Sequence, residues 1–92
     1  MYAVRLRRGA PRSLQDVLTP SVAAAVIEVL DGPLRTDPDS TGKPLDEPFV
    51  GWRVVRRGEY RIIFSVDHAR RIVDVVRIDH RRDIYRGAPN GR

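Results

Sequence analysis

The arginines of this sequence are the side chains whose type and spacing suggest chemistry most directly. The chain holds 17 Lys and Arg against 12 Asp and Glu, and Lys43 is its only lysine. Residues 1–46 carry six cations and six acids, whereas residues 47–92 carry eleven arginines and six acids, which accounts for the whole excess of +5. Guanidinium groups stay charged and bind phosphates through paired hydrogen bonds. The pattern favours an anionic partner, nucleic acid first, although arginines that merely hydrate the surface would give the same composition.

Several function classes are excluded by residues that the sequence lacks. It contains no cysteine, which rules out a disulfide scaffold and thiol chemistry, and its two histidines do not supply the ligands of a structural zinc site. No glycine-rich phosphate loop follows a predicted strand. We therefore expect neither a metal nor a cofactor. No apolar run approaches the length of a membrane span and no signal peptide pattern begins at Met1, so we expect a cytoplasmic protein without a membrane partner.

The elements that must position the arginines follow from the apolar periodicity. The patterns predict the order β-α-α-β-β-β, with strands over residues 2–7, 51–56, 60–66 and 72–78 and helices over 11–18 and 20–31. Thr19 and Pro20 form a helix start, and Gly32 forms a helix stop. Residues 32–48, with four prolines, are expected to form a long loop. The polar tail 79–86 is expected to form a helical turn at most.

The resulting fold class is α+β, in a single domain over residues 1–92 with a frayed end at 87–92. A helical hairpin packs on one face of a mostly antiparallel, twisted sheet. The face under the helices takes four apolar side chains, namely Tyr60, Ile62, Phe64 and Val66. Arg61 then emerges on the opposite, solvent-facing side. We expect Arg53 and Arg57 beside it, which would make that face a phosphate-binding surface.

Three segments carry a resemblance to a known family. They are Gly42–Leu45 (GKPL), Arg56–Val66 (RRGEYRIIFSV) and Val76–Arg86 (VRIDHRRDIYR). Together with the predicted element order, they resemble the RelE/ParE superfamily of bacterial toxin–antitoxin toxins, in particular RelE-type members from actinobacteria. The resemblance spans residues 2–86, and it implies a RelE-like fold.

The resemblance implies a toxin of a type II toxin–antitoxin system that enters the ribosomal A site and cleaves mRNA there as an endoribonuclease, without a metal. Such cleavage needs an activated 2′-hydroxyl, a stabilised phosphorane charge and a protonated leaving oxygen, and guanidinium groups supply the second of these. The implied partners are the ribosome, mRNA and a cognate antitoxin. That antitoxin is expected to be acidic and partly disordered, to form a complex such as a heterotetramer, and to link the toxin to operator DNA.

Individual residues take roles from the same resemblance. Arg61 matches the strand arginine that contacts the scissile phosphate. His80 and Arg81 lie where family members keep an imidazole or a basic group near the leaving oxygen, and Tyr85 matches a C-terminal tyrosine that orients a base. Further RNA contacts are expected from Arg53, Arg56, Arg57 and Arg82. Several RelE-type enzymes have lysines on the strand before Arg61, where this chain has only arginines, so the general base stays unassigned.

Each candidate has a structural alternative. Arg61 can instead pair with an acid across the sheet, such as Asp74. His80 can be a surface residue after a strand, and Tyr85 can close the core. Trp52 is interpreted as a core or strand-edge anchor, with base stacking as its alternative. The function has alternatives too: a ParE-like toxin that inhibits DNA gyrase without cutting RNA, or an inactive module that binds an antitoxin as a corepressor.

Overall fold

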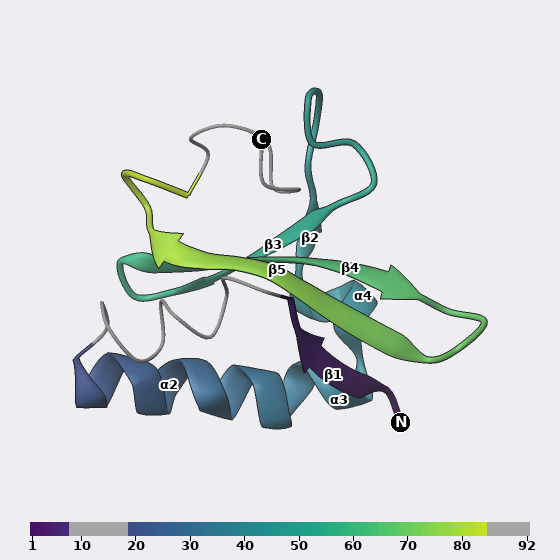
Figure 1. Cartoon of the computed structure of the whole chain (residues 1–92), viewed down its shortest axis with the longest axis horizontal. Coiled ribbons are helices and arrows are strands. Elements are labelled where there is room, and N and C mark those ends of the chain that lie inside the picture. Colours follow the sequence, from purple (N-terminus) through teal and green to yellow (C-terminus); the bar gives the residue numbers. More distant parts are fainter. Residues whose placement is uncertain (8–18, 85–92) are drawn as a thin grey trace.

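Five strands form a twisted sheet, and a helix lies across one of its faces (Figure 1). The structure is a computed structural model and describes residues 1–7 and 19–84. The strands are β1 (Ala3–Leu6), β2 (Lys43–Pro44), β3 (Arg53–Arg57), β4 (Tyr60–Asp67) and β5 (Ile72–His80), and the helices are α2 (Pro20–Asp31), α3 (Pro33–Thr36) and α4 (Pro38–Thr41). The predicted helix over 11–18, Tyr85 and the expected frayed end at 87–92 lie outside the described residues.

The strand order β1-β5-β4-β3-β2 puts the two longest strands, β5 and β4, inside the sheet. β1 runs parallel to β5, and all the other neighbours are antiparallel. In the β4–β5 ladder Ile63 lies opposite Arg77 but Phe64 lies opposite Val75, so Val76 is an extra residue in β5. Such a β-bulge changes the direction of the side chains on its strand. Here Val75 joins the apolar cluster on one face of the sheet and Val76 joins the cluster on the other.

α2 supplies the helical side of the core. Thr19 caps its N-terminus, since its side chain accepts a hydrogen bond from the Val22 amide at 3.3 Å, and Pro20 occupies the first turn, where no amide hydrogen is needed. The buried side chains of the helix recur at helical spacing and are Val26, Val29 and Leu30. Among the helices that the structure describes, none combines the length and the apolar character needed to cross a membrane.

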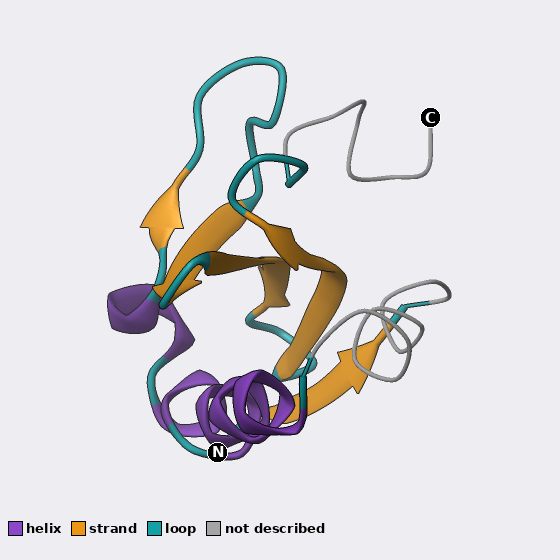
Figure 2. Cartoon of the chain, turned by 90° about the vertical axis from the view of Figure 1, so that its left-hand side faces the viewer, coloured by secondary structure: helices purple, strands orange, loops and turns teal. Residues whose placement is uncertain are grey.

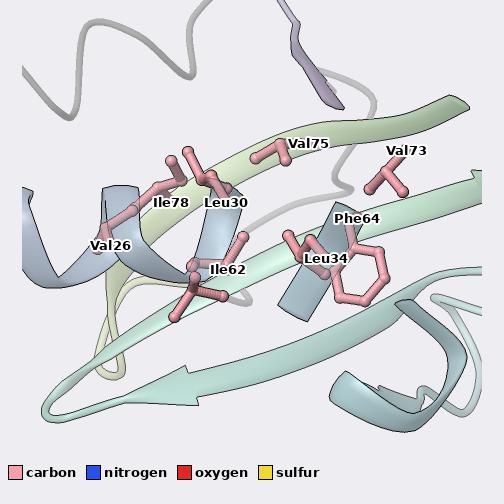
Figure 3. Close-up of a cluster of buried hydrophobic side chains, with 9 residues drawn as sticks. Val26, Leu30, Leu34, Ile62, Phe64, Val73, Val75 and Ile78 are labelled. Carbon is pink, nitrogen blue, oxygen red and sulfur yellow. The ribbon is translucent and has the colours of Figure 1, made fainter. Parts of the chain in front are cut away.

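The main core lies between the sheet and the helices α2 and α3 (Figure 3). Its buried members are Val26, Val29, Leu30, Leu34, Ile62, Phe64, Val73, Val75 and Ile78. Tyr60 and Val66 pack against this cluster, so the predicted apolar face of β4 is confirmed. Figure 2 shows α2 nearly end-on, with the curled sheet arching over it.

The opposite face of the sheet carries a second, smaller apolar cluster. Its buried members are Ile63, Val76 and Ile84, and Leu45, Trp52 and Val54 pack against them. The expectation of a solvent-facing surface around Arg61 is therefore wrong over the middle of the sheet, because the β-bulge directs Val76 to this side. Trp52 packs in this cluster, which confirms its interpretation as a core or strand-edge anchor.

Residues 32–48 do not form the long loop that their prolines suggested. Pro33 and Pro38 begin the short helices α3 and α4, because a proline in the first turn of a helix sacrifices no hydrogen bond. β2 then pairs with β3 at Lys43–Pro44 and holds the segment against the sheet.

β5 is longer than predicted. It continues through Asp79 and His80, where the sequence pattern predicts a polar tail. The reason is that the ladder with β4 extends until His80 lies opposite Tyr60, the first residue of that strand. The extension brings the end of β5 beside the β3–β4 turn.

Candidate functional site

Most of the candidate residues gather at one end of the sheet, where β3 turns into β4 and β5 stops (left in Figure 1). A two-residue turn, Gly58-Glu59, joins β3 to β4, and Gly58 has a φ of 60°, a conformation that favours glycine. The Arg81 amide donates a hydrogen bond to the Glu59 carbonyl oxygen at 2.8 Å. The turn and the chain that follows β5 are therefore joined side by side.

Arg61 is held in place by its own turn. Its Nη1 donates to the carbonyl oxygens of Gly58 and Tyr60, both at 3.0 Å, and the residue is half-buried. The residues opposite it are Arg56 on β3 and Asp79 on β5. Within the described residues, the Arg61 guanidinium makes no ion pair, and Asp79 is the acid that lies opposite it on the same face.

Asp74, the acid named as the structural alternative for Arg61, is not its partner, because Asp74 has a different one. Asp74 lies opposite Arg5 in the β1–β5 ladder and opposite Ser65 in the β4–β5 ladder. It forms a hydrogen-bonded ion pair with Arg5. That hydrogen bond, reinforced by the guanidinium charge, lowers the pKa of the Asp74 carboxyl despite the opposing effect of partial burial.

Arg81 follows the end of β5 and lies beside the β3–β4 turn. Its side chain forms an ion pair with Glu59, the turn residue that comes two residues before Arg61. Arg81 Nε lies 2.8 Å from Glu59 Oε1, and the two side chains are 62% and 64% exposed. An exposed ion pair of this kind contributes at most about 1 kcal/mol. A competing anion can therefore open it at little cost.

His80 projects from the other face of the sheet. It lies opposite Tyr60, and the two rings meet edge to face, with centroids 5.5 Å apart and planes at 81°. Its Nδ1 accepts a hydrogen bond from the Arg82 amide at 3.1 Å, and this contact assigns the proton of the neutral imidazole to Nε2. The sheet thus separates His80 from Arg61, although both lie at the same end.

Arg53 and Arg57 do not flank Arg61, and the expectation that they would is wrong. The two-residue turn pairs Arg57 with Tyr60, and in this register Arg56 is the residue opposite Arg61. Arg53 and Arg57 therefore lie on the helix side of the sheet. The residue types on β3 do not decide this arrangement, because the register that the turn imposes determines which β3 residue lies opposite Arg61.

The contacts of Arg53 and Arg57 stabilise the fold. Arg53 Nη2 donates to the carbonyl oxygens of Asp39 at 2.6 Å and Gly42 at 2.9 Å. Arg57 Nη2 lies 3.2 Å from Glu28 Oε1 on α2. The first side chain ties β3 to the α4 region, and the second ties β3 to α2.

Comparison with known proteins places the chain in a family. The family model described as ParE toxin of type II toxin-antitoxin system, parDE, matches residues 4–85. The chain belongs to this ParE toxin family. Two curated relatives come from Mycobacterium tuberculosis (strain ATCC 25618 / H37Rv). Toxin RelG is 41% identical over 85 residues, which cover 92% of this chain and 97% of the relative. Toxin RelE is 36% identical over 88 residues, which cover 96% and 90%.

A solved structure of a relative has the same fold as this ParE-family toxin. The toxin–antitoxin complex RelBE2 from Mycobacterium tuberculosis matches with a TM-score of 0.80 and 38% sequence identity, over 86% of this chain and 96% of that chain. The α+β, RelE-like fold and the resemblance to the RelE/ParE superfamily are thereby confirmed. The protein is a RelE-type toxin of a type II toxin–antitoxin system.

Lys43 is a cation of the toxin that sequence reasoning did not select. It lies on β2 opposite Val54, and therefore on the same face as Arg56 and Arg61. The signal available in the sequence was its place in the GKPL segment and its being the only lysine. No periodicity pointed to β2, because that strand has two residues.

The remaining candidates of the toxin lie at or beyond the end of β5. Arg82 is exposed in the turn that follows the strand, and Tyr85 lies outside the described residues. Over residues 1–7 and 19–84, no group of three His, Asp or Glu side chains is arranged to hold a metal ion. The candidate site of the described chain is therefore a cationic patch of Arg56, Arg61 and Arg81, with His80 on the other side of the sheet.

Proposed function

We propose that the toxin is a ribosome-dependent mRNA endoribonuclease that cleaves in the ribosomal A site without a metal. The observation that carries the proposal is the gathering of Arg56, Arg61 and Arg81 at one end of the sheet, where Arg56 and Arg61 lie opposite each other on one face. Three guanidinium groups concentrate fixed positive charge where a phosphorane would need it. The relatives named RelG and RelE support the same class of activity.

In the proposed reaction, Arg61 binds the scissile phosphate. Its position is set by two backbone carbonyls, so the guanidinium needs little rearrangement as charge develops on the phosphate. Arg81 leaves its exposed pair with Glu59 and adds a second cation to the same group. To protonate the leaving oxygen where the RNA rounds the end of the sheet, His80 has to act as the imidazolium. Its Nδ1 must first release the Arg82 amide and take up a proton, after which Nε2 donates its proton and leaves a neutral imidazole.

The proposed partners are the ribosome, mRNA and a cognate antitoxin. The structure of the RelBE2 relative is a toxin–antitoxin complex, and this likeness supports an antitoxin for the present chain. An acidic, partly disordered antitoxin would complement the net charge of +5 and cover the cationic patch. Such a complex, for example a heterotetramer, would also link the toxin to operator DNA. We propose that these encounters take place in the cytoplasm.

Induced expression in bacteria tests the proposal. We expect growth and translation to stop and primer extension to map new cuts within translated mRNA shortly after induction. Arg61→Ala and Arg81→Ala should each restore growth and remove the cuts, because each deletes a cation from the patch. Circular dichroism of the purified variants should match that of the parent, since both side chains lie outside the two apolar clusters.

Arg70→Ala is the matched control. Arg70 is an exposed arginine in the turn between β4 and β5, at the other end of those strands, so the variant loses one positive charge away from the patch. It should remain as toxic as the parent. If Arg61→Ala and Arg81→Ala at equal abundance cut mRNA as well as Arg70→Ala does, the assigned site is wrong.

A second candidate function is inhibition of DNA gyrase, which the ParE name of the matching family favours. It predicts DNA-damage signalling together with intact mRNA after induction. An inactive corepressor would bind its antitoxin tightly without stopping growth. The same induction experiment therefore separates all three functions.

A further inference from the structure

A cleft of about 260 Å³ lies at the outer edge of β3. Its lining residues are Thr41, Lys43, Val54, Val55 and Arg56. β2 is the edge strand and pairs with only two residues of β3, Val54 and Arg53. Within the part of the chain that the structure describes, no strand pairs with this side of β3 beyond Val54. The cleft is therefore open to a ligand that approaches along the sheet.

The two cations of this cleft continue the face of Arg61. Lys43 lies opposite Val54, and Arg56 follows Val54 by two residues, so both side chains are on one side of the sheet. Arg56 lies opposite Arg61 on the next strand. With strands about 4.8 Å apart and about 3.4 Å per residue along each, the Lys43 and Arg61 backbones are about 12 Å apart. Arg56 lies between them and makes the row continuous.

Neither cation is used by the fold. Arg5, Arg35, Arg57 and Arg81 each have a carboxylate partner. In the described regions, by contrast, the Lys43 ammonium and the Arg56 guanidinium make no ion pair and no side-chain hydrogen bond. Two like charges held close together without a counter-charge repel each other. An anion bound between them would remove that repulsion.

The position of Lys43 is fixed by the residues behind it. Gly42 is buried against the Phe64 ring, so closely that a Cβ at this position would lie 2.6 Å from Phe64 Cζ. Arg53 donates to the Gly42 carbonyl oxygen at 2.9 Å from the other strand. The lysine therefore projects from backbone that packing and a hydrogen bond hold in place.

We propose that Lys43 and Arg56 form a second phosphate subsite, so that an RNA strand bound at Arg61 continues across β3 to the outer edge of the sheet. The inference rests on the proposed function. It adds Lys43 to the RNA-binding residues and gives the direction in which the RNA strand crosses the sheet. RNA is the occupant that the observations favour, because the cations form a row of the kind that a chain of phosphates needs, and Val54, on the same face, offers apolar surface to a sugar or base. Lys43 serves as a binding residue in this site.

Salt-dependent binding of the purified toxin to a single-stranded RNA oligonucleotide tests the subsite. The logarithm of the binding constant falls with the logarithm of salt concentration by about 0.7 for each phosphate contacted on a single strand. Lys43→Gln should make the slope shallower by about 0.7. Lys43→Arg, which keeps the positive charge, should have the parental slope. The control Arg70→Gln loses the same charge in the β4–β5 turn and should keep the parental slope. Equal slopes for Lys43→Gln and Arg70→Gln would overturn the proposal.

Two other outcomes are distinguishable. If Arg61→Ala lowers the slope and Lys43→Gln does not, only the second subsite fails, and the proposed nuclease survives. If the parent toxin binds RNA without salt dependence and leaves mRNA intact in cells, the proposed function fails with it. If Lys43→Gln keeps the RNA slope and instead weakens binding of an acidic antitoxin peptide, the cleft belongs to the antitoxin and our assignment is wrong.

Discussion

Replacing Gly42 with alanine tests whether packing behind β2 sets the position of Lys43. Gly42 is buried, and a Cβ there would lie 2.6 Å from Phe64 Cζ, 2.7 Å from Phe64 Cε1 and 3.2 Å from the Val54 carbonyl oxygen. The φ of −113° and ψ of 158° at Gly42 suit any residue, so the backbone conformation is no obstacle to alanine. The expected cost of Gly42→Ala is therefore steric.

The size of that cost follows from the burial of Phe64, whose side chain has no exposed surface and cannot move into solvent. Forcing an extra carbon into a packed core costs about 1–3 kcal/mol. Alanine also lowers the conformational entropy of the unfolded protein relative to glycine, which stabilises the folded state by about 0.4–1 kcal/mol. We expect Gly42→Ala to lower the free energy of unfolding by about 1–2 kcal/mol. Since Phe64→Leu removes the clashing ring atoms, the two substitutions should show a favourable coupling of about 1 kcal/mol.

Urea unfolding of the parent, the two single variants and the double variant measures this coupling, with circular dichroism as the signal. The reasoning is refuted if Gly42→Ala unfolds within about 0.5 kcal/mol of the parent, the usual range for a harmless substitution. It is equally refuted if the alanine has the same cost in the Phe64→Leu background. Either result would mean that the Phe64 ring does not press on Gly42, and the support for the fixed position of Lys43 would be lost.

Two further predictions concern stability. The hydrogen bond from Arg5 lowers the pKa of Asp74 in the folded protein, so its stabilising effect is present above the unfolded pKa of about 3.9 and is lost as the pH falls through the lower folded value. Asp74→Asn should therefore unfold more easily than the parent at pH 7, and the difference in urea midpoint should shrink below about pH 4. Ile84→Ala empties a fully buried site and should cost about 2–5 kcal/mol, whereas Ile27→Ala, at a position 46% exposed on α2, should cost about 0.5 kcal/mol or less in the same assay.

Much of the main core could be predicted from the sequence because its signals are local. Thr19 and Pro20 begin α2, and the spacing of Val26 and Leu30 identifies the buried stripe. The period of two in β4 correctly assigns Ile62 and its neighbours to the helix side. These patterns depend on residues within one element, so they do not need the rest of the fold.

The features that the sequence did not reveal depend on pairing between elements. Alternation alone cannot place Arg53 and Arg57, since the register across the β3–β4 turn decides which β3 residue lies opposite Arg61. The extra residue Val76 has no local signature, because the bulge exists only relative to β4. β2 has two residues and is defined by its hydrogen bonds to β3, so Lys43 could not be placed on the cationic face.

The cations of the described chain fall into two groups: some bind acids or carbonyl oxygens within the fold, and others are unpaired and lie on one face of the sheet. Arg53 binds backbone carbonyls and Arg57 binds a carboxylate, so both hold elements together. Lys43, Arg56 and Arg61 are not paired with acids in the described residues, and they share one face. Such a row of like charges opposes folding, and a bound polyanion would add RT ln(1 + [L]/Kd) to the stability. RNA and an acidic antitoxin would both bind these unpaired cations. The binding of one should therefore exclude the other from this face.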